Sequence, residues 1–391
     1  MPNVIVAGAA RTPMGAFQGA LTPVPAPDLA GIAARAALGE AEGARPEEVV
    51  MGCVLAAGLG QAPARQAGFA AGLGEGVPAT TLNKMCGSGM AAAMAAHDRI
   101  ALGGAACILA GGMESMTGAP YLLPQERGGA RIGHGRVIDS MFRDGLEDAY
   151  ERDPNGAPRL MGTFAEDCAE AFQFTREDQD AYALASLSRA LEAQRSGAFA
   201  REIAAVTVTG RKGDTVVGDD EQPGTARPDR IPHLKPAFRA GGTVTAANSS
   251  SISDGAAALV LAAEETGLAP RAYIRGHATH AQAPGMFPTA PIPAARKLMD
   301  RLGWQVRDVD LWEVNEAFAV VPMAFMRELG VPHAAMNVNG GACALGHPIG
   351  ASGARILVTL LNAMEARDAR RGVAAICIGG GEGMAVALER P

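Results

Sequence analysis

The chain has few of the features that mark secreted scaffolds, membrane proteins or nucleic-acid binders. Its 391 residues include six cysteines and no Cys-x-x-Cys pair, which argues against a disulfide framework and favours a reducing compartment. The chain has no run of about 18 apolar residues, which is the length needed to span a bilayer. The opening residues Met-Pro-Asn-Val-Ile-Val predict a strand and not a basic leader, so we expect a cytoplasmic protein. The formal net charge of −7 argues against a broad nucleic-acid surface or an anionic membrane patch.

Aromatic residues are also scarce, at 4%, whereas the chain contains 50 glycines and 48% hydrophobic residues. This composition is typical of a globular protein packed closely with small side chains, not of a disordered or fibrous chain. The length allows two or three domains with large cores. Since the net charge is negative, any phosphate binding must come from a local basic cluster.

The same order of elements occurs in both halves of the chain. Each half predicts a helix and a strand, then a second helix, a buried strand and a glycine-rich turn. Short apolar strands that alternate with helices indicate parallel sheets covered on both faces, so we expect a duplicated α/β unit. The ranges are 29–40, 48–55, 90–102, 105–110 and 111–112 in the first half, and 293–302, 309–314, 354–366, 373–378 and 379–381 in the second.

The composition changes over residues 119–246, which contain more charged residues, prolines and glycines. Segments 122–136 and 219–239 predict loops, and 175–196 predicts a helix with Thr175 as its cap and Asp178 completing a capping box. An insert of this kind favours a substrate-covering region or an oligomer contact. The predicted domains are a first half (1–118 with 247–268), the insert (119–246) and a second half (269–391).

Two cysteines in glycine-rich frames, with a histidine between them in the chain, are the strongest functional signal. Cys86 lies in Asn-Lys-Met-Cys-Gly-Ser-Gly-Met, Cys377 opens Cys-Ile-Gly-Gly-Gly, and His347 lies in Gly-His-Pro-Ile-Gly. A thiol attacks as a thiolate, so it needs a lowered pKa or a base, and its reaction needs oxyanion donors. Cys86 precedes a predicted helix, whose N-terminus would favour the thiolate. We expect the neighbouring glycines to admit substrate and to leave backbone N–H groups free.

Each of these residues also has a structural interpretation. Cys86 or Cys377 could be a small buried hydrophobic residue, and His347 a hydrogen-bonded residue of a tight turn. Asn315, where a strand gives way to a helix, could be an N-cap or an amide that orients a water. The spacing of Cys343 and His347 fits a metal site, but no second ligand pair accompanies it, so we predict no metal.

Together these segments resemble the thiolase family, in its acetyl-CoA acetyltransferase and 3-ketoacyl-CoA thiolase branch. The resemblance spans essentially the whole chain, and it implies two mixed five-stranded sheets in α-β-α-β-α layers with an inserted loop domain. The motifs that carry it are Ala-Ala-Arg-Thr-Pro-Met-Gly (9–15), residues 83–90, Gly-Gly-Met-Glu-Ser-Met (111–116), Met-Gly-Thr (161–163), Gly-Thr-Val-Thr-Ala-Ala-Asn-Ser-Ser (242–250), Asn-Glu-Ala-Phe-Ala (315–319), 340–355 and 377–381.

The resemblance implies a role for each catalytic candidate. Cys86 is acylated, His347 activates it, and Cys377 exchanges a proton at the α-carbon of acetyl-CoA. Asn315 holds a water that forms one oxyanion hole with His347, and the N–H groups of Cys86 and Gly379 form the other. The implied reaction is a ping-pong Claisen condensation of two acetyl-CoA to acetoacetyl-CoA and CoA, and its reverse thiolysis. It needs no cofactor beyond the CoA thioesters.

The resemblance also implies contacts to CoA and between subunits. A frequent family arginine is replaced here by Pro223, so Arg227 or Arg230 is expected to take over a phosphate contact. The family forms homodimers, often paired into homotetramers by a loop of the insert, near Phe142 and Arg143. The local basic side chains are Arg211, Lys212, Arg227, Arg230, His233 and Lys235. The expected CoA-binding residues are Arg211, Arg227, Arg230, Leu234, Phe238, Ser250, Met161 and Phe318.

The size of the acyl group stays open. Leu160, Phe287 and Cys343 stand where acetoacetyl-specific relatives often carry other residues. Acetoacetyl-CoA is the leading substrate, and a broader degradative 3-ketoacyl-CoA thiolase is the alternative. A non-catalytic CoA- or lipid-binding homologue is a more distant one. Ketoacyl synthases usually carry histidine in place of the second cysteine, so Cys377 counts against that class.

Overall fold

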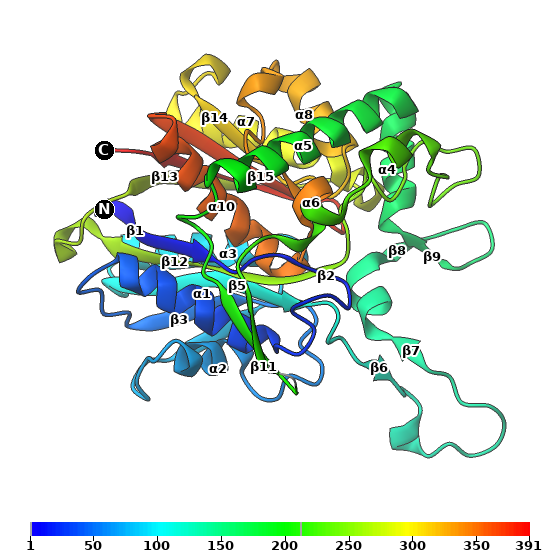
Figure 1. Cartoon of the computed structure of the whole chain (residues 1–391), viewed down its shortest axis with the longest axis horizontal. Coiled ribbons are helices and arrows are strands. Elements are labelled where there is room, and N and C mark those ends of the chain that lie inside the picture. Colours follow the sequence, from blue (N-terminus) through cyan, green and yellow to red (C-terminus); the bar gives the residue numbers. More distant parts are fainter. Residues whose placement is uncertain (1, 212) are drawn as a thin grey trace.

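The computed structural model of the protein describes residues 2–211 and 213–391, so Lys212 of the expected basic cluster lies outside the described part. Figure 1 shows two central helices between two groups of strands, with further helices on both outer faces. The first half contains β1 (Val4–Arg11), β2 (Gly15–Ala16), α1 (Ala26–Glu40), β3 (Glu48–Gly52), α2 (Pro63–Ala70), β4 (Ala79–Leu82), α3 (Ser88–Ala101), β5 (Cys107–Ser115) and β12 (Ser253–Ala263).

The second half repeats this order of elements. It contains β13 (Ala272–Ala281), α7 (Pro291–Leu302), β14 (Leu311–Val314), α8 (Val320–Leu329), α9 (Ala342–Leu345), α10 (Ile349–Ala366), β15 (Arg371–Ile378) and β16 (Glu382–Glu389). Between the halves lie β6 (Tyr121–Leu122), β7 (Ile138–Asp139), β8 (Glu147–Arg152), β9 (Pro158–Leu160), α4 (Met161–Ala171), α5 (Arg176–Ser196), β10 (Val206–Gly210), β11 (Gly213–Val217) and α6 (Glu221–Thr225).

The strands of the two halves are joined edge to edge. The order is β14-β15-β16-β13-β1-β12-β5-β3-β4, with β2 paired to β12. The junction of β1 with β13 has two residue pairs, Ile5 with Tyr273 and Val6 with Ala272. A bridge between Trp312 and Met336 extends the second half beyond β14, in the position that β4 occupies in the first. The predicted α/β class and duplication are confirmed, and the two half-sheets meet at this short junction.

The strand directions are mixed, so the purely parallel sheets that the alternation of strands and helices predicted are wrong. Parallel pairs join β3 to β4 and β5, and β14 to β15. The pairs of β1 with β12 and β13, of β12 with β5, and of β16 with β13 and β15 are antiparallel. Strands covered on both faces are apolar in either direction, so hydrophobicity alone does not report strand direction.

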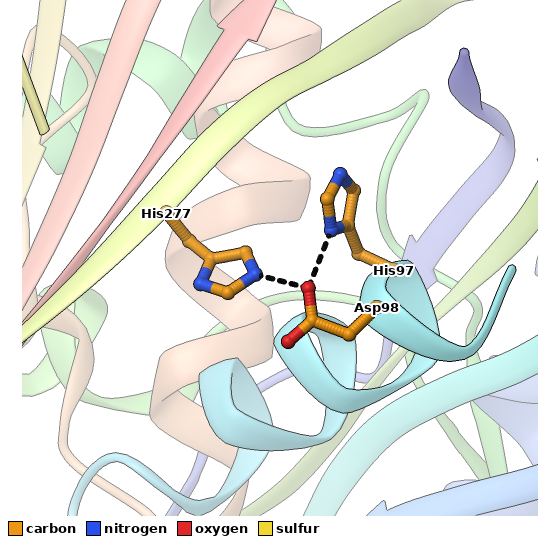
Figure 2. A group of neighbouring side chains, drawn as sticks. All are labelled: His97, Asp98 and His277. Atoms are coloured by element: carbon orange, nitrogen blue, oxygen red, sulfur yellow. Dashed lines mark hydrogen bonds and ion pairs between the residues drawn. The ribbon is translucent and has the colours of Figure 1, made fainter. Parts of the chain in front are cut away.

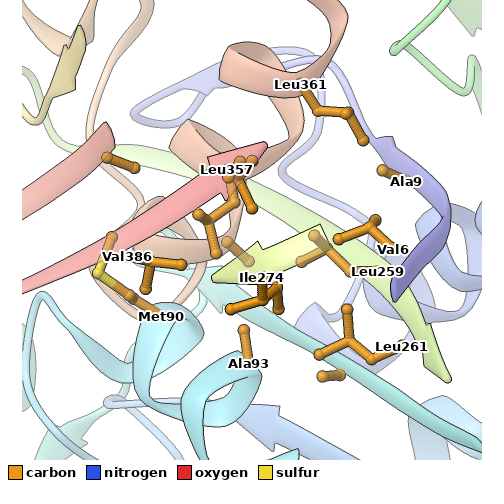
Figure 3. Packing of buried hydrophobic residues seen from close by; sticks show 14 of the residues in the cluster. Val6, Ala9, Met90, Ala93, Leu259, Leu261, Ile274, Leu357, Leu361 and Val386 are labelled. Carbon is orange, nitrogen blue, oxygen red and sulfur yellow. The ribbon is translucent and has the colours of Figure 1, made fainter. Parts of the chain in front are cut away.

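Alternate residues of the buried strands face different cores, which produces the five layers. In β12, Leu259 and Leu261 face the central core, whereas Ala258 and Val260 face the core under α1 and α2. Figure 3 shows the central core, where side chains of β1 and β12 meet those of α3 and α10. A third core packs β15 and β16 against α7 and α8. The implied α-β-α-β-α arrangement follows from this period of two.

Glycines let the two central helices approach backbone to backbone. A Cβ at Gly89 of α3 would lie 2.7 Å from the Ala354 nitrogen of α10, and one at Gly353 would lie 2.4 Å from the Met90 nitrogen. Gly112 has the same function, because a Cβ there would lie 2.1 Å from the Gly350 oxygen. Gly111 and Gly112 therefore lie inside β5, and the glycine-rich turn predicted at these positions is wrong.

A buried charge cluster connects the insert to β1. The Arg11 Nε lies 2.7 Å from Glu202, and its Nη1 lies 2.6 Å from Asp220, with all three side chains fully buried. The guanidinium also lies 4.8 Å from the centre of the Phe199 ring. Within the insert, α5 begins with the predicted capping box of Thr175 and Asp178. The segment around β6 and β7 extends away from the layers (Figure 1).

Replacing Arg11 would leave two carboxylates buried without a countercharge. We expect Arg11→Ala to lower the free energy of unfolding by about 3–5 kcal/mol, measured by urea unfolding followed by circular dichroism. Arg195→Ala is the control, because Arg195 pairs with Glu192 on the surface, where such pairs contribute about 0.3–0.5 kcal/mol. Equal effects of the two substitutions would contradict a stabilising role for the buried cluster.

Candidate active site

The backbone before α3 holds Cys86 in a constrained loop. Met85 has a φ of +48°, a left-handed conformation that is strained for a residue with a side chain. The Asn83 Oδ1 accepts the Met85 N–H at 2.9 Å, and the Ser88 Oγ accepts the Lys84 N–H at 2.8 Å. The Ser88 hydroxyl also donates to the Met85 carbonyl at 2.7 Å. These bonds fix the direction of the Cys86 side chain at the start of the helix.

The surroundings of Cys86 favour the neutral thiol. The residue is partly exposed, but burial of its sulfur raises the pKa to about 11. The backbone N–H groups of Gly379 and of Cys86 itself lower this pKa, and the charge of Glu114 raises it slightly. The expected net lowering by the helix N-terminus is therefore wrong, because desolvation outweighs the helix dipole. A thiol of this kind needs a base when it attacks.

His347 has the state that such a base requires. Burial, and then the charge of Arg355, lower its pKa to about 3, so the imidazole is neutral near pH 7. The Ser352 Oγ donates to the Pro348 carbonyl at 2.9 Å and lies 2.6 Å from the His347 Nδ1. Because this hydroxyl has one proton, the Nδ1 must donate to it, which leaves the Nε2 as an acceptor. Ser352 was not recognised from the sequence, although it lies in the quoted segment 340–355.

Asn315 lies beside this free nitrogen. Its Nδ2 is 3.5 Å from the His347 Nε2, and its buried Oδ1 has no hydrogen-bond partner among the described residues. A buried carbonyl oxygen of this kind is usually satisfied by an ordered water or a ligand. The N-cap interpretation of Asn315 is wrong, because α8 begins at Val320 and its N-cap is Ala319.

The turn after Cys377 faces the Cys86 loop. Burial first, and then the charge of Cys86, raise the pKa of the Cys377 thiol. Gly380 and Gly381 have φ values of +93° and +88°, so the turn itself requires these two glycines. A Cβ at Gly379 would touch only the Met161 Sδ, at 3.4 Å. Packing therefore does not require a glycine at position 379.

The glycines beside Cys86 have a different explanation. A Cβ at Gly87 would lie 2.5 Å from the Met384 Cε, and Gly89 contacts α10 as described above. Close packing therefore explains both glycines, without the expected role in admitting substrate. An ion pair between Lys84 and Glu382 joins the Cys86 loop to the glycine turn.

Two buried carboxylates hold the loops of the site together, and the sequence assigned neither of them a role. Glu114 accepts the N–H groups of Val54, Leu55 and Gly350 at 2.9–3.1 Å, and burial raises its pKa to about 7. It thus connects the end of β3 to the start of α10. Its only signal in the sequence was its place in Gly-Gly-Met-Glu-Ser-Met.

Glu316 makes a similar connection on the other side of the site. It accepts hydrogen bonds from the Tyr182 and Ser186 hydroxyls of α5 at 2.9 and 2.7 Å, and from the Asn337 amide at 2.7 Å. The Cys343 N–H also donates to it, at 3.0 Å. The partly buried Cys343 is thus a direct neighbour of Glu316.

Several of the expected CoA-binding residues line one cavity of about 340 Å³, between the insert and α9. Arg227, Arg230 and Leu234 line it together with Ala247 and Cys343. Arg211 does not line it. It follows β10, and Figure 1 shows the β10–β11 hairpin extending away from α6 to the far side of the first half.

The other expected CoA-binding residues form a second group next to the turn at Gly379–Gly381. They are Phe238, Phe318, Ser250 and Met161. The Phe238 and Phe318 rings are edge to face at 5.9 Å, and Phe318 also lies 6.5 Å from the buried Phe287. The Ser250 hydroxyl donates to the Ala317 carbonyl at 2.9 Å. Met161, at the start of α4, touches the Gly379 position.

The lowered pKa of His347 makes a prediction about acid stability. The unfolded chain binds a proton near pH 6.5 and the folded chain only near pH 3, so this residue lowers stability as the pH falls through that window. Between pH 7 and 5 the wild type should lose about 2 kcal/mol more unfolding free energy than His347→Gln. Urea unfolding at the two pH values measures this difference, and equal losses would contradict a buried neutral imidazole.

The sequence and the fold were compared with those of known proteins. The model "Thiolase, N-terminal domain" matches residues 4–265, and "Thiolase, C-terminal domain" matches residues 268–390. The chain is 46% identical to the acetyl-CoA acetyltransferase of Cupriavidus necator, over 100% of both chains. It is 48% identical to acetyl-CoA acetyltransferase 2 of Arabidopsis thaliana, over 99% of this chain and 97% of the relative.

A solved structure extends this similarity to the fold. The crystal structure of the Bacillus anthracis acetyl-CoA acetyltransferase matches with a TM-score of 0.95 and 38% identity, over 100% of this chain and 99% of that one. Both halves of the chain and the order of their elements are therefore shared with these relatives. The chain belongs to the thiolase family.

Proposed function

We propose that the protein is an acetyl-CoA C-acetyltransferase, which converts two acetyl-CoA to acetoacetyl-CoA and CoA and catalyses the reverse thiolysis. The full-length similarity to proteins of that name supports this activity. The observation that carries the proposal is the protonated Cys86, which faces the Gly379 N–H, together with a neutral His347 that Ser352 orients. This arrangement suits acyl transfer through a covalent thioester.

The first half-reaction uses these groups in order. As the Cys86 sulfur attacks the thioester carbonyl, its proton passes to the free Nε2 of His347. The N–H groups of Cys86 and Gly379 stabilise the oxyanion, because both already point to the sulfur. CoA leaves with the proton from His347, and Cys86 remains acylated. The desolvation that raises the thiol pKa also keeps water from this thioester.

The second half-reaction forms the carbon–carbon bond. We assign to Cys377 the removal of a proton from the α-carbon of the second acetyl-CoA: its thiol proton first passes to the Nε2 of His347, and the resulting thiolate takes the α-proton. The enolate oxygen is held by the Nε2–H of His347 and by a water on Asn315, a role that the unpartnered Oδ1 of Asn315 supports. The carbanion attacks the acyl carbon, and Cys86 leaves as a thiolate that takes the proton back from His347, which restores both thiols and the neutral imidazole. The reaction is redox-neutral and uses only thiol, imidazole and amide groups, so CoA thioesters suffice without a further cofactor.

For CoA itself, we assign the phosphates to Arg227 and Arg230. Their shared cavity supports this assignment, whereas the position of Arg211 on the β10–β11 hairpin does not support a contact from that residue. Leu234 would line the nucleotide site. Ser250, Met161, Phe238 and Phe318 would line the pantetheine path, which agrees with their position next to the Gly379 turn.

We further propose that the protein forms homodimers or homotetramers, with the segment around β6 and β7 as a contact. Apolar side chains on this segment support it, since Tyr121 is 69% and Ile132 is 100% exposed. All six cysteines are free, which supports a reducing compartment such as the cytoplasm. Across residues 2–211 and 213–391, no helix has both the length and the apolar character needed to cross a membrane.

The roles of the two cysteines separate in an acylation experiment. With acetyl-CoA as donor, Cys86→Ala should lose the acetyl-enzyme, seen by mass spectrometry of the intact protein. Cys377→Ala should keep it but lose condensation by about 10³-fold or more. Cys107→Ala is the control, since Cys107 is buried in β5 under the outer core and should change neither step. Full condensation by Cys377→Ala would overturn its assignment as the carbon base.

Acyl-chain length separates the proposed enzyme from a degradative 3-ketoacyl-CoA thiolase. Phe287, which the family resemblance assigns to the acyl pocket, is buried, and its ring centre lies 6.0 Å from that of Phe164 and 6.5 Å from that of Phe318. We propose that this packing limits the length of the acyl group. We expect kcat/KM for thiolysis to be higher for the four-carbon than for the six-carbon 3-ketoacyl-CoA. Phe287→Ala should raise the six-to-four ratio by about tenfold. A wild-type preference for six carbons or more would favour the degradative alternative.

A further inference from the structure

We propose that His97, Asp98 and His277 bind one divalent transition-metal ion, with Zn²⁺ as the best match. The cluster lies outside the proposed active site, and its three potential ligand atoms lie within 4.8 Å of one another. The Asp98 Oδ1 lies between the two rings, 3.0 Å from the His97 Nδ1 and 2.7 Å from the His277 Nε2 (Figure 2). The ring centroids are 5.1 Å apart and the rings nearly perpendicular.

Two separate elements supply these side chains. His97 and Asp98 lie near the C-terminal end of α3, and His277 lies on β13. A bulge between Ile274 and Gly276 changes which side chains of β13 point to each face of the sheet. Ala278 therefore faces the core under α7, and His277 faces α3. Without this shift the imidazole would point to the other face of the sheet.

The ligand set suits zinc in type and number. Two imidazoles and one carboxylate match the three protein ligands of many open zinc sites, with water in the fourth position. Two of the ligand pairs already have separations close to those in a tetrahedral site, and only the two histidines must move closer. Asp98, whose side chain is 56% exposed, can adjust with them, whereas both histidines are held at less than 20% exposure.

The charges around the cluster also favour a cation. Asp98 supplies a negative charge between the two imidazoles, with its Oδ1 within hydrogen-bond distance of both. Two arginines next to the cluster have partners outside its three ligand atoms. Arg301 donates to the His277 carbonyl at 3.2 Å, and Arg99 pairs with Glu48 on β3.

The position of the site gives such an ion a structural effect. It would join α3 of the first half to β13 of the second, close to where the two half-sheets share two residue pairs. Because α3 begins two residues after Cys86, the ion would hold the far end of the helix that carries the proposed nucleophile. A metal that binds the folded chain more tightly than the unfolded chain raises its unfolding temperature.

The test uses full-length protein stripped of metal with a chelator. Titration with Zn²⁺ by calorimetry should show one ion per chain, with a dissociation constant on the order of micromolar or tighter. Co²⁺ as a spectroscopic substitute should give weak visible bands of nitrogen and oxygen ligands, without the charge-transfer band of a cysteine complex. Zn²⁺ should also raise the unfolding temperature of the wild type.

Matched variants decide the assignment. His277→Ala and Asp98→Asn should each weaken Zn²⁺ binding by about tenfold or more and remove the thermal shift. His280→Ala, three residues along the same strand and outside the cluster, should bind as the wild type does. Circular dichroism establishes whether each variant is folded. If His277→Ala does not fold, Asp98→Asn still tests the proposal, because it is an exposed and nearly isosteric change. The proposal is overturned if binding requires millimolar Zn²⁺, shows cysteine charge transfer, or is unchanged in the folded variants.

Discussion

Gly89 and Gly353 hold the two central helices at a separation that no residue with a side chain would allow. The other features of the site depend on this contact. Cys86 lies just before α3 and His347 just before α10, so the close approach of the helices brings together loops that are 261 residues apart in the chain. Gly112 extends the same contact to β5. The duplicated halves are thus joined along their helices much more than at the short junction of β1 and β13.

The second constraint is desolvation. Burial raises the pKa values of the Cys86 and Cys377 thiols and lowers that of His347, so these three groups of the resting site are neutral. A site of neutral groups needs no countercharge in its interior. Charge then develops only when substrate arrives, next to N–H groups that are already in place, and this is the condition under which such donors are most effective. The buried carboxyl groups of Glu114 and Glu316 instead fix loops, since each accepts several hydrogen bonds.

The sequence predicted local features well. The capping box at Thr175, the helices before and after each buried strand, and the turn at Gly379–Gly381 depend on neighbouring residues, and all are confirmed. Family membership was also accessible, because it depends on motifs whose order can be seen in the chain. The prediction failed where a distant contact decides the outcome. Gly111 and Gly112 resemble a turn until α10 is packed on them, and apolar strands do not reveal their directions.

The same division holds for the site. The sequence by itself was enough to propose which residues carry the chemistry, because two cysteines and a histidine in glycine-rich frames, accompanied by the Asn-Glu-Ala-Phe-Ala motif, form a specific combination. Only the tertiary structure decided their states. The thiol at a helix N-terminus is protonated because burial outweighs the dipole. Arg227 lines the cavity beside α9, whereas Arg211 follows β10 and does not line it. Asn315 is left with a free oxygen because its helix begins five residues later. Protonation, proximity and unsatisfied hydrogen bonds are properties of the packed environment, and residues far apart in the chain create that environment.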